Sequence, residues 1–202
     1  MREKHTDLRI VKTREALSKA LITLLSKKAF QDVRISELCD EAGVSRATFY
    51  NNFSSMDEVF AFFLQTMWDP ILAQVKKETR EKHLIINEVY YRFVELTVTR
   101  FEPLHEVFMS ILKVNPSSQV FDCLNTYLNK AIYEMMGEFS EYDFDMPQDM
   151  LVSYIAGGFT GLLLHMYPRA RNLTRDEKIY YLYHLTFEIY FLYNIHRKGV
   201  KA

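Results

Sequence analysis

Apolar residues recur every three or four positions along nearly the whole chain, with charged and polar residues between them. In the first such segment they fall at Leu17, Ala20, Leu21, Leu24 and Leu25. This spacing is that of an amphipathic helix, and no run shows the strict alternation of a half-buried strand. Only 6 Gly and 5 Pro punctuate the 202 residues. The pattern therefore predicts an all-α protein with long helices and short loops.

The first two predicted helices occupy the N-terminal end of the chain. Helix one begins at Thr13 or just before it and runs to about Lys28. Helix two spans roughly residues 36–42 and is stopped by Gly43, because glycine adopts the left-handed conformation that ends many helices.

Capping residues mark the start of the next two helices. Helix three begins at Ser45, whose hydroxyl can accept a hydrogen bond from a free amide of the first turn. Helix four begins in the sequence SSMDE, where Ser55 and Glu58 are placed to form a capping box.

Proline residues mark further boundaries, because proline cannot donate a hydrogen bond within a helix. Two long helices are predicted near the C-terminus, at about residues 147–167 and about residues 174–197. Pro168 closes the first of them, and Thr174 with Glu177 opens the second as a capping box. The prolines expected at a boundary or first turn are Pro70, Pro103, Pro116 and Pro147.

The composition is that of an ordinary globular protein of one large or two small domains, with 49% apolar residues and a net charge of -1. The charge is uneven, because residues 1–34 carry nine basic and four acidic side chains. This basic end allows a modular nucleic-acid binder, although the net charge excludes a wholly basic one.

Several function classes lack their motifs in this sequence. Cys39 and Cys123 lie 84 positions apart, which suggests neither a disulfide framework nor a metal site. His165 and His184 could approach each other, but no ligand cluster supports a metal, and no cofactor is expected. Without a nucleophile elbow or a phosphate loop, an enzyme is not expected. The N-terminus has no apolar targeting region, and IAGGFTGLLLHMY is shorter than the roughly 20 residues of a membrane helix, so a cytoplasmic protein without a membrane anchor is expected.

The segment GVSRATFYNNF, residues 43–53, combines a turn with a short helix that is aromatic on one side and polar on the other. With Phe49 at the centre of the buried face, Phe53 lies about 40° away. Arg46 and Tyr50 then lie on the flank and the outer face, where they could meet phosphates and base edges, and Ala47 is small enough to let the helix approach a groove floor. Any short amphipathic helix has a polar face, however, so spacing alone leaves DNA recognition open.

The run ISELCDEAGVSRATFYNNFSSMDEVF, within about residues 9–67, closely resembles the N-terminal domain of the TetR (tetracycline repressor) family of bacterial transcription regulators. The shared pattern is a hydrophobic residue, an acid and a hydrophobic residue in that order, then AGVS, then Thr-Phe-Tyr, a phenylalanine three positions on and an acidic helix start. The form LCDEAGVSRATFY, with DLRIVKTREAL before it, is most similar to a branch that includes regulators of dihydroxyacetone kinase operons.

The resemblance implies an all-α fold of about nine helices. A three-helix helix-turn-helix DNA-binding domain would occupy residues 1–54, and a helical effector-binding and dimerisation domain residues 55–202, with helix four, about residues 55–68, connecting them. It implies a bacterial, ligand-responsive repressor that binds a palindromic operator as a homodimer.

Carried over residue by residue, the resemblance implies a set of DNA contacts. The base-reading positions are Arg46 and Ala47, with Ser36 as a further candidate. The remaining contacts, most of them at phosphate-contacting positions, are Ser45, Thr48, Tyr50, Asn51 and Asn52. The family commonly has histidine where Asn52 stands and lysine where Met56 stands. Methionine cannot supply that charge, although Lys12, Arg14 or Arg34 could offset its loss.

The C-terminal two thirds resembles the family only in architecture, and its candidate sites follow from that. An effector of apolar or aromatic character is expected among Tyr90, Phe93, Phe108, Met109, Tyr127, Tyr154 and Phe159. The expected dimer interface holds Gly157, Gly161, His165, His184, Phe187 and Phe191. Aromatic residues at helical spacing also form plain cores, and the glycines could instead pack within one subunit.

Two functions from different classes remain open at this point. The first is a homodimeric DNA-binding repressor that responds to a ligand. The second is a co-regulator that senses a metabolite and contacts a partner protein in place of DNA, which Met56, Asn52 and the negative net charge favour.

Overall fold

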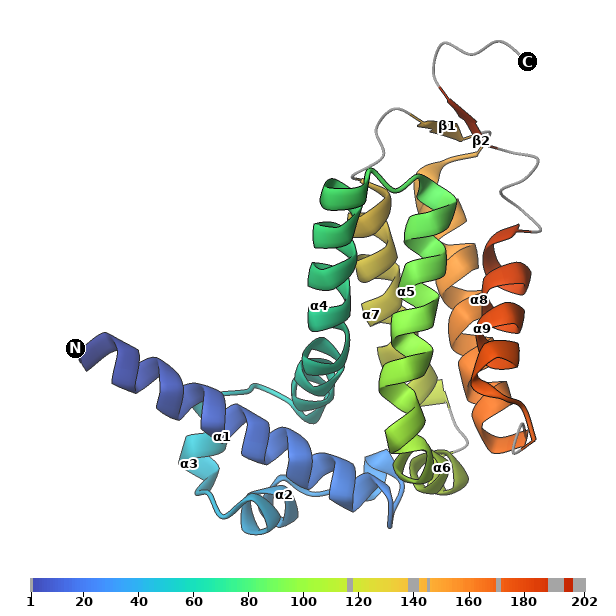
Figure 1. Cartoon of the computed structure of the whole chain (residues 1–202). Coiled ribbons are helices and arrows are strands. Elements are labelled where there is room, and N and C mark those ends of the chain that lie inside the picture. The colour runs from blue at the N-terminus through green and yellow to red at the C-terminus, as the bar shows by residue number, and fades with distance from the viewer. Residues whose placement is uncertain are drawn as a thin grey trace. The chain divides into compact units, whose positions relative to one another are not determined.

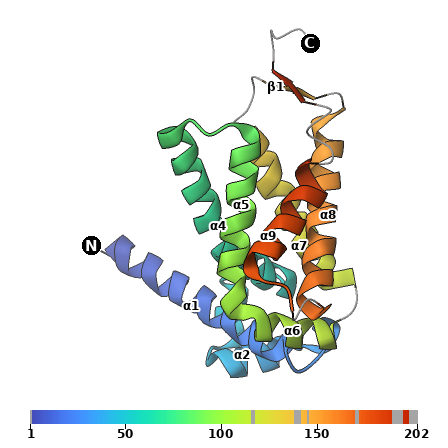
Figure 2. The same ribbon diagram turned by 45° about the vertical axis from the view of Figure 1, so that its right-hand side comes forward.

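The structure is a computed structural model (Figures 1 and 2), and it describes residues 2–115, 118–137, 142–144, 146–169, 172–188 and 195–197. Its α-helices are α1 Arg2–Leu25, α2 Ile35–Ala42, α3 Arg46–Tyr50, α4 Met56–Lys82, α5 Ile86–Phe101, α6 His105–Val114, α7 Ser118–Met136, α8 Gln148–Arg169 and α9 Arg175–Tyr183. Short 3₁₀ turns η1 Phe30–Asp32 and η2 Glu102–Leu104 follow α1 and α5, and a π-helical turn, η3 His184–Glu188, follows α9. The predicted all-α fold with an N-terminal helix-turn-helix is confirmed.

Two three-residue strands are the exception to the helical pattern within the described residues. Strand β1, Tyr142–Phe144, pairs antiparallel with β2, Ile195–Arg197. The prediction of one helix from about residue 174 to 197 is therefore wrong at its end, since α9 stops at Tyr183 and η3 at Glu188. The β-branched Ile195 and the cross-strand pairing favour extended backbone at that position.

The other boundaries differ from expectation at four places. The first helix starts at Arg2 and ends at Leu25, before the predicted Lys28. Pro70 lies inside α4, where it is exposed, so the missing backbone donor falls where water reaches the helix. The Ser55 hydroxyl accepts from the Glu58 amide at 3.2 Å, which confirms one half of the predicted capping box, whereas the Glu58 carboxylate accepts from the Ser54 amide at 2.7 Å instead of the Ser55 amide. The predictions for Pro103 and Pro147 hold to within a residue or two, Pro168 lies one residue before the end of α8, and Pro116 falls outside the described residues.

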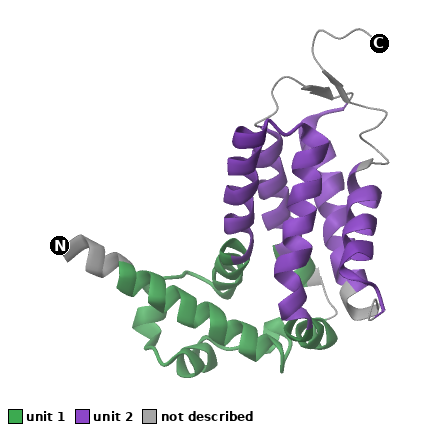
Figure 3. Ribbon diagram, in the orientation of Figure 1, with its two compact units in different colours: residues 1–66, 106–123 green, residues 67–105, 124–202 purple. Residues whose placement is uncertain are grey.

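The chain divides into two compact units (Figure 3), and the first is built from two separate stretches, residues 1–66 and 106–123. Helix α1 packs against α2, and α2 against α3. Their shared core contains Leu21, Leu38 and Phe49, each with 0% of its surface exposed. The apolar spacing that predicted amphipathic helices is therefore used to bury one face of each helix in this unit.

Asn115, directly after α6, holds the two stretches of unit 1 together. Its side-chain Oδ1 accepts from the Phe30 backbone amide at 2.6 Å, and its Nδ2 donates to the carbonyl oxygens of Leu25 and Ile111, both at 3.1 Å. Only 3% of Asn115 is exposed. One asparagine thus caps the end of α1 and fixes the start of η1 to the end of α6.

The second unit comprises residues 67–105 and 124–202, and it is a helical bundle in which α5, α8 and α9 lie side by side (Figures 1 and 2). Tyr90 on α5 stacks on Phe187 with ring centroids 4.6 Å apart, and its hydroxyl lies 2.7 Å from that of Thr186. Burial raises the pKa of the Tyr90 phenol, so the phenol stays neutral. The core of this unit is therefore aromatic at its centre.

Helix α8 is both long and apolar. Its residues Gln148–Met166 are long and apolar enough to cross a membrane by length and composition alone, which the sequence reading had not expected. Of that window 44% is buried inside the protein. A core helix of a globular protein meets the same criterion, so this finding is weak support for a membrane span.

Candidate nucleic-acid interface

The turn between α2 and α3 depends on Gly43, as the sequence predicts. Its φ of 66° and ψ of 33° place it in the left-handed region, which costs glycine no steric strain. The Gly43 amide donates to the Asp40 carbonyl oxygen at 3.2 Å, and the Val44 amide to the Cys39 carbonyl oxygen at 2.9 Å. These bonds satisfy the end of α2 and redirect the chain into α3.

Helix α3 is capped and anchored by its own short sequence. The Ser45 hydroxyl accepts from the Thr48 amide at 3.1 Å, which confirms the predicted cap. Phe49 is fully buried, and its ring lies 6.4 Å from that of the buried Phe53. Because the aromatic side is fixed to the core, the opposite side of this short helix must face solvent.

The predicted DNA-contacting residues all retain some exposure. The exposed ones are Ser45, Arg46, Ala47, Tyr50 and Asn51, and the half-buried ones are Ser36, Thr48 and Asn52. Tyr50 has 60% of its surface exposed although its ring makes an edge contact with Phe49 at 5.2 Å. The structure thus gathers the α3 residues on one accessible surface, with Ser36 at the start of α2.

Three of these polar side chains are already engaged in local hydrogen bonds at the two ends of α3. The Thr48 hydroxyl lies 2.9 Å from that of Ser45, and the Asn52 side-chain amide donates to the Thr48 carbonyl oxygen at 2.8 Å. The Asn52 Oδ1 is buried without a hydrogen-bond partner. Asn52 is thus held against the helix by a bond that uses one of its two side-chain N–H groups.

Of the basic residues that could offset Met56, Arg14 is used inside the unit. Its guanidinium carbon lies 4.6 Å from the centre of the Phe53 ring and 4.7 Å from that of Phe62. Cation–π contacts of this kind hold the side chain over the rings. Lys12 and Arg34 are exposed on the same unit, so they remain the better candidates for the missing charge.

Glu37 organises the start of α2 close to this surface. It accepts from Lys28 Nζ at 2.7 Å and from the Arg34 amide at 3.0 Å. The Lys28 hydrogen bond, followed by that of the amide, lowers the pKa of the Glu37 carboxyl. Lys28 is therefore paired with a carboxylate and contributes little net positive charge.

The predicted effector residues do not enclose one cavity. Tyr90, Phe93 and Phe159 pack as a continuous core, with 6.2 Å between the first two rings and 5.6 Å between the last two. Tyr127 instead packs on Trp68, and its hydroxyl donates to Asp69 at 2.5 Å. Tyr154 is 54% exposed on α8. Phe108 and Met109 belong to unit 1, whereas the other five belong to unit 2.

The predicted interface residues fall into four groups. Gly161 and His165 are exposed on α8, and Gly157 and His184 are half-buried. Phe187 is buried within its own chain with 3% exposure, because its ring stacks on Tyr90. Phe191 lies outside the described residues.

The described side chains form no cluster of metal ligands. No group of three or more His, Cys, Asp or Glu residues is placed to hold a metal ion there. Cys39 is buried and Cys123 half-buried, and both are free thiols. Burial, with Asp57 and Asp122 nearby, raises the pKa of the Cys123 thiol to about 11, so it is not a reactive thiolate.

Residues 17–61 match the family model for bacterial regulatory proteins of the tetR family. An HTH-type transcriptional regulator of Bacillus subtilis, YxbF, is 36% identical over 75 residues, which are 37% of this chain but only 19% of that protein. The chain thus spans about one fifth of the length of that relative. An HTH-type transcriptional regulator of Haemophilus influenzae is 23% identical over 176 residues, 83% of this chain and 82% of that protein.

Solved structures resemble the described fold over most of its length. The FadR repressor of Thermus thermophilus, a TetR-family protein in complex with lauroyl-CoA, aligns with a TM-score of 0.62 at 15% identity, covering 94% of this chain and 99% of that one. A TetR regulator of Streptococcus agalactiae aligns with a TM-score of 0.55 at 18% identity, covering 91% and 98%. The likeness in fold therefore extends well beyond residues 17–61.

Proposed function

We propose that this chain, whose residues 17–61 match the family model for bacterial regulatory proteins of the tetR family, is a transcriptional regulator, a ligand-responsive repressor that binds a palindromic operator as a homodimer. The observation that carries the proposal is the accessible surface of α3, where Arg46, Ala47 and Tyr50 are exposed opposite the buried Phe49. Family members are regulators, so no enzymatic activity is proposed, and the protein is placed in the bacterial cytoplasm.

We assign the contacts by side-chain chemistry. Arg46 can donate two hydrogen bonds to guanine O6 and N7, and the Ala47 methyl can contact a thymine methyl. Tyr50 and Asn51 are placed for phosphates, which fix register and orientation but not sequence. Ser36 at the start of α2 is a further base contact in this proposal.

The exposed face of α8 supports the homodimer. Met150 and Tyr154 are 64% and 54% exposed, and Gly158, Gly161 and His165 continue the same stripe at a spacing of three or four. A Cβ added at Gly161 would meet no atom within 4 Å. Packing within the chain therefore does not require this glycine, whereas close approach of a second copy would.

Ligand control would act through differential affinity. A ligand shifts the equilibrium only if it binds the conformation that cannot hold DNA more tightly than the one that can. The Thermus relative of similar fold is a repressor in complex with lauroyl-CoA, which supports a small-molecule effector here. The sequence form LCDEAGVSRATFY supports a regulator related to those of dihydroxyacetone kinase operons, and we include that placement in the proposal.

Selection from a pool of random DNA duplexes tests the proposal. Full-length protein should enrich a two-fold symmetric sequence whose half-site centres are at least about 34 Å apart, because each subunit sets one α3 into a major groove. Enrichment of no sequence, or of a half-site without symmetry, would refute the palindromic operator.

A co-regulator that binds a partner protein is the second candidate. The bond from Asn52 to the Thr48 carbonyl and the methionine at position 56 favour it, because both reduce the phosphate contacts available. The same selection distinguishes the two functions, since a co-regulator would enrich no duplex.

A further inference from the structure

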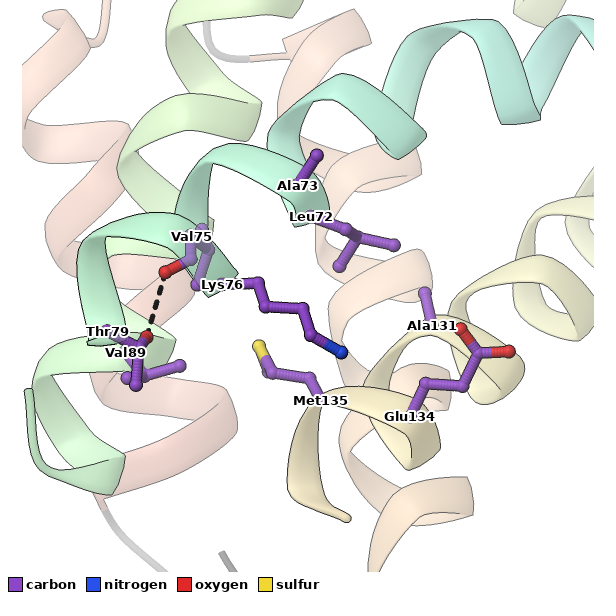
Figure 4. Close-up of a pocket in the computed structure, with 9 residues that line it drawn as sticks. All are labelled: Leu72, Ala73, Val75, Lys76, Thr79, Val89, Ala131, Glu134 and Met135. Atoms are coloured by element: carbon purple, nitrogen blue, oxygen red, sulfur yellow. Dashed lines mark hydrogen bonds between the residues drawn. The ribbon is translucent and has the colours of Figure 1, made fainter. Parts of the chain in front are cut away.

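A cavity of about 130 Å³ opens between α4, α5 and α7 within unit 2 (Figure 4). Its apolar lining comes from Leu72, Ala73, Val75, Val89, Ala131 and Met135, and its polar lining from Lys76, Thr79 and Glu134. None of these residues belongs to the aromatic set expected from the sequence. The cavity is therefore a separate site that remains to be assigned.

The inner wall of the cavity is hydrocarbon. Val75, Val89 and Ala131 are 2%, 2% and 3% exposed. The Thr79 hydroxyl donates to the Val75 carbonyl oxygen at 2.8 Å, so its proton is not available to a ligand. Engineered apolar cavities of about 150 Å³ bind benzene. This wall thus suits the hydrocarbon part of a molecule of roughly six to eight heavy atoms.

The rim carries one charge of each sign. Figure 4 shows the Lys76 side chain extended across the cavity from α4 and Glu134 on α7 beyond its ammonium group, and Glu134 Oε1 also lies 4.0 Å from Lys130 Nζ. A ligand head group at the rim therefore meets an ammonium and a carboxylate together. A neutral hydroxyl can accept from the first and donate to the second, whereas a charged head group meets one like charge and loses hydration.

A second void lies behind Val89 and Met135, which line both spaces. It measures about 10 Å³ and is otherwise bounded by Ile86, Tyr90, Ile132, Met136, Ile155 and Phe187. A void of that size among hydrocarbon side chains does not hold water. Because methionine side chains are flexible, a change of Met135 rotamer can join the two spaces into a deeper, narrow channel.

We propose that this cavity binds neutral straight-chain molecules with one terminal hydroxyl group. The chain lies along Val89 and Ala131, Met135 moves to admit its end, and the hydroxyl lies between Lys76 and Glu134. As the site of an effector, this assignment rests on the proposed function, but the binding itself does not depend on DNA.

The test is a titration of full-length protein with primary alcohols from butanol to hexanol, followed by NMR of ¹³C-labelled methionine methyl groups. The Met135 methyl signal, assigned with Met135→Leu, should shift saturably. Affinity should rise about fourfold for each added methylene, because burying one CH₂ group contributes about 0.8 kcal/mol to the binding free energy. A Met135 signal that does not move, or affinities that do not rise with chain length, would overturn the site.

Charged analogues test the rim. Hexanoate and hexylamine should both bind more weakly than hexanol. The preference for the amine over the acid should rise in Lys76→Met, fall in Glu134→Gln, and stay unchanged in Lys77→Met, whose lysine is 71% exposed and pairs with Glu81 outside the cavity. Tighter binding of either charged analogue to the wild type, or equal preferences in the three variants, would overturn the proposed ligand class.

A DNA titration separates this inference from the proposed function. If hexanol moves the Met135 signal and also weakens operator binding, both stand. If the protein binds no DNA at all, the proposed function fails while the Met135 shift still supports the cavity. If operator binding is tight but hexanol leaves Met135 unchanged, the cavity assignment is wrong.

Discussion

Replacing Asn115 with alanine should weaken unit 1, although this residue lies 85 positions from Phe30 in the sequence. The substitution removes the acceptor for the Phe30 amide and the donor to the Leu25 carbonyl oxygen, which ends α1. The Ile111 carbonyl oxygen keeps a partner, because the Asn115 backbone amide also donates to it at 2.8 Å.

The expected cost follows from the groups left unpaired. A buried amide without an acceptor costs about 1–3 kcal/mol, and a lost hydrogen bond to a carbonyl about 1 kcal/mol more. Phe30 is only 6% exposed, so water does not readily replace the lost partner. We therefore expect Asn115→Ala to lower the free energy of unfolding by roughly 2–4 kcal/mol.

Urea denaturation of the two proteins measures this difference, and hydrogen exchange locates it. The Phe30 amide should exchange faster in the variant. Asn129→Ala is the matched control, because the Asn129 side chain bonds only one turn back, to the Asn125 carbonyl at 2.9 Å. Asn115→Asp keeps the acceptor but turns an ionised oxygen toward carbonyls, so it should be destabilising at neutral pH and less so in acid. The reasoning would be refuted if Asn115→Ala lowered the free energy of unfolding no more than Asn129→Ala does, and if hydrogen exchange of the Phe30 amide were unchanged.

Four further predictions follow from local geometry. Gly43→Ala should cost about 1 kcal/mol in urea unfolding, because φ of 66° disfavours any Cβ, and a neutral result would contradict this. Arg92 hydrogen bonds hold the pKa of Glu78 at about 2, below its usual 4.5, so Arg92→Met should destabilise at neutral pH and progressively less as pH falls from 4.5 toward 2. If the loss of unfolding free energy in Arg92→Met were the same at every pH, the lowered pKa of Glu78 would not contribute to stability. Gly161→Leu should leave the folded subunit intact but raise the dimer dissociation constant in sedimentation equilibrium, and an unchanged constant argues against the α8 interface. A fragment of residues 1–66 should unfold at lower urea than the full chain, because it lacks residues 106–123 of unit 1.

The helix-turn-helix could be predicted from the sequence because its signals are local. Gly43, Ser45 and Phe49 each act within a few residues, through a left-handed turn, a cap and a buried ring. The Asn115 bonds and the β1–β2 pairing join segments far apart in the chain. No local pattern marks such partners, so the extent of unit 1 and the end of α9 could not be read from the sequence. The domain boundary expected at residues 54/55 stays a prediction.

The direction of a side chain was harder to predict than its type. Arg14 is a cation in a basic segment, yet it packs over Phe53 and Phe62, because two ring faces lie within its reach. Three of the aromatic residues expected around an effector, Tyr90, Phe93 and Phe159, pack in the core instead of enclosing one large cavity. The cavity lies between α4, α5 and α7, and its lining includes the small residues Ala73 and Ala131, a property of helix pairing that composition does not record.

The most direct test of DNA recognition by α3 is a fluorescence anisotropy titration of the selected duplex at several salt concentrations. The Arg46→Ala, Tyr50→Ala double variant should lose about 1–3 kcal/mol for the base contact and show a salt slope smaller by about one for the lost phosphate contact. Lys130→Ala, Tyr133→Ala, which removes an exposed cation and an exposed tyrosine from α7, should bind like the wild type. Tight binding by the α3 variant with an unchanged salt slope would contradict the account.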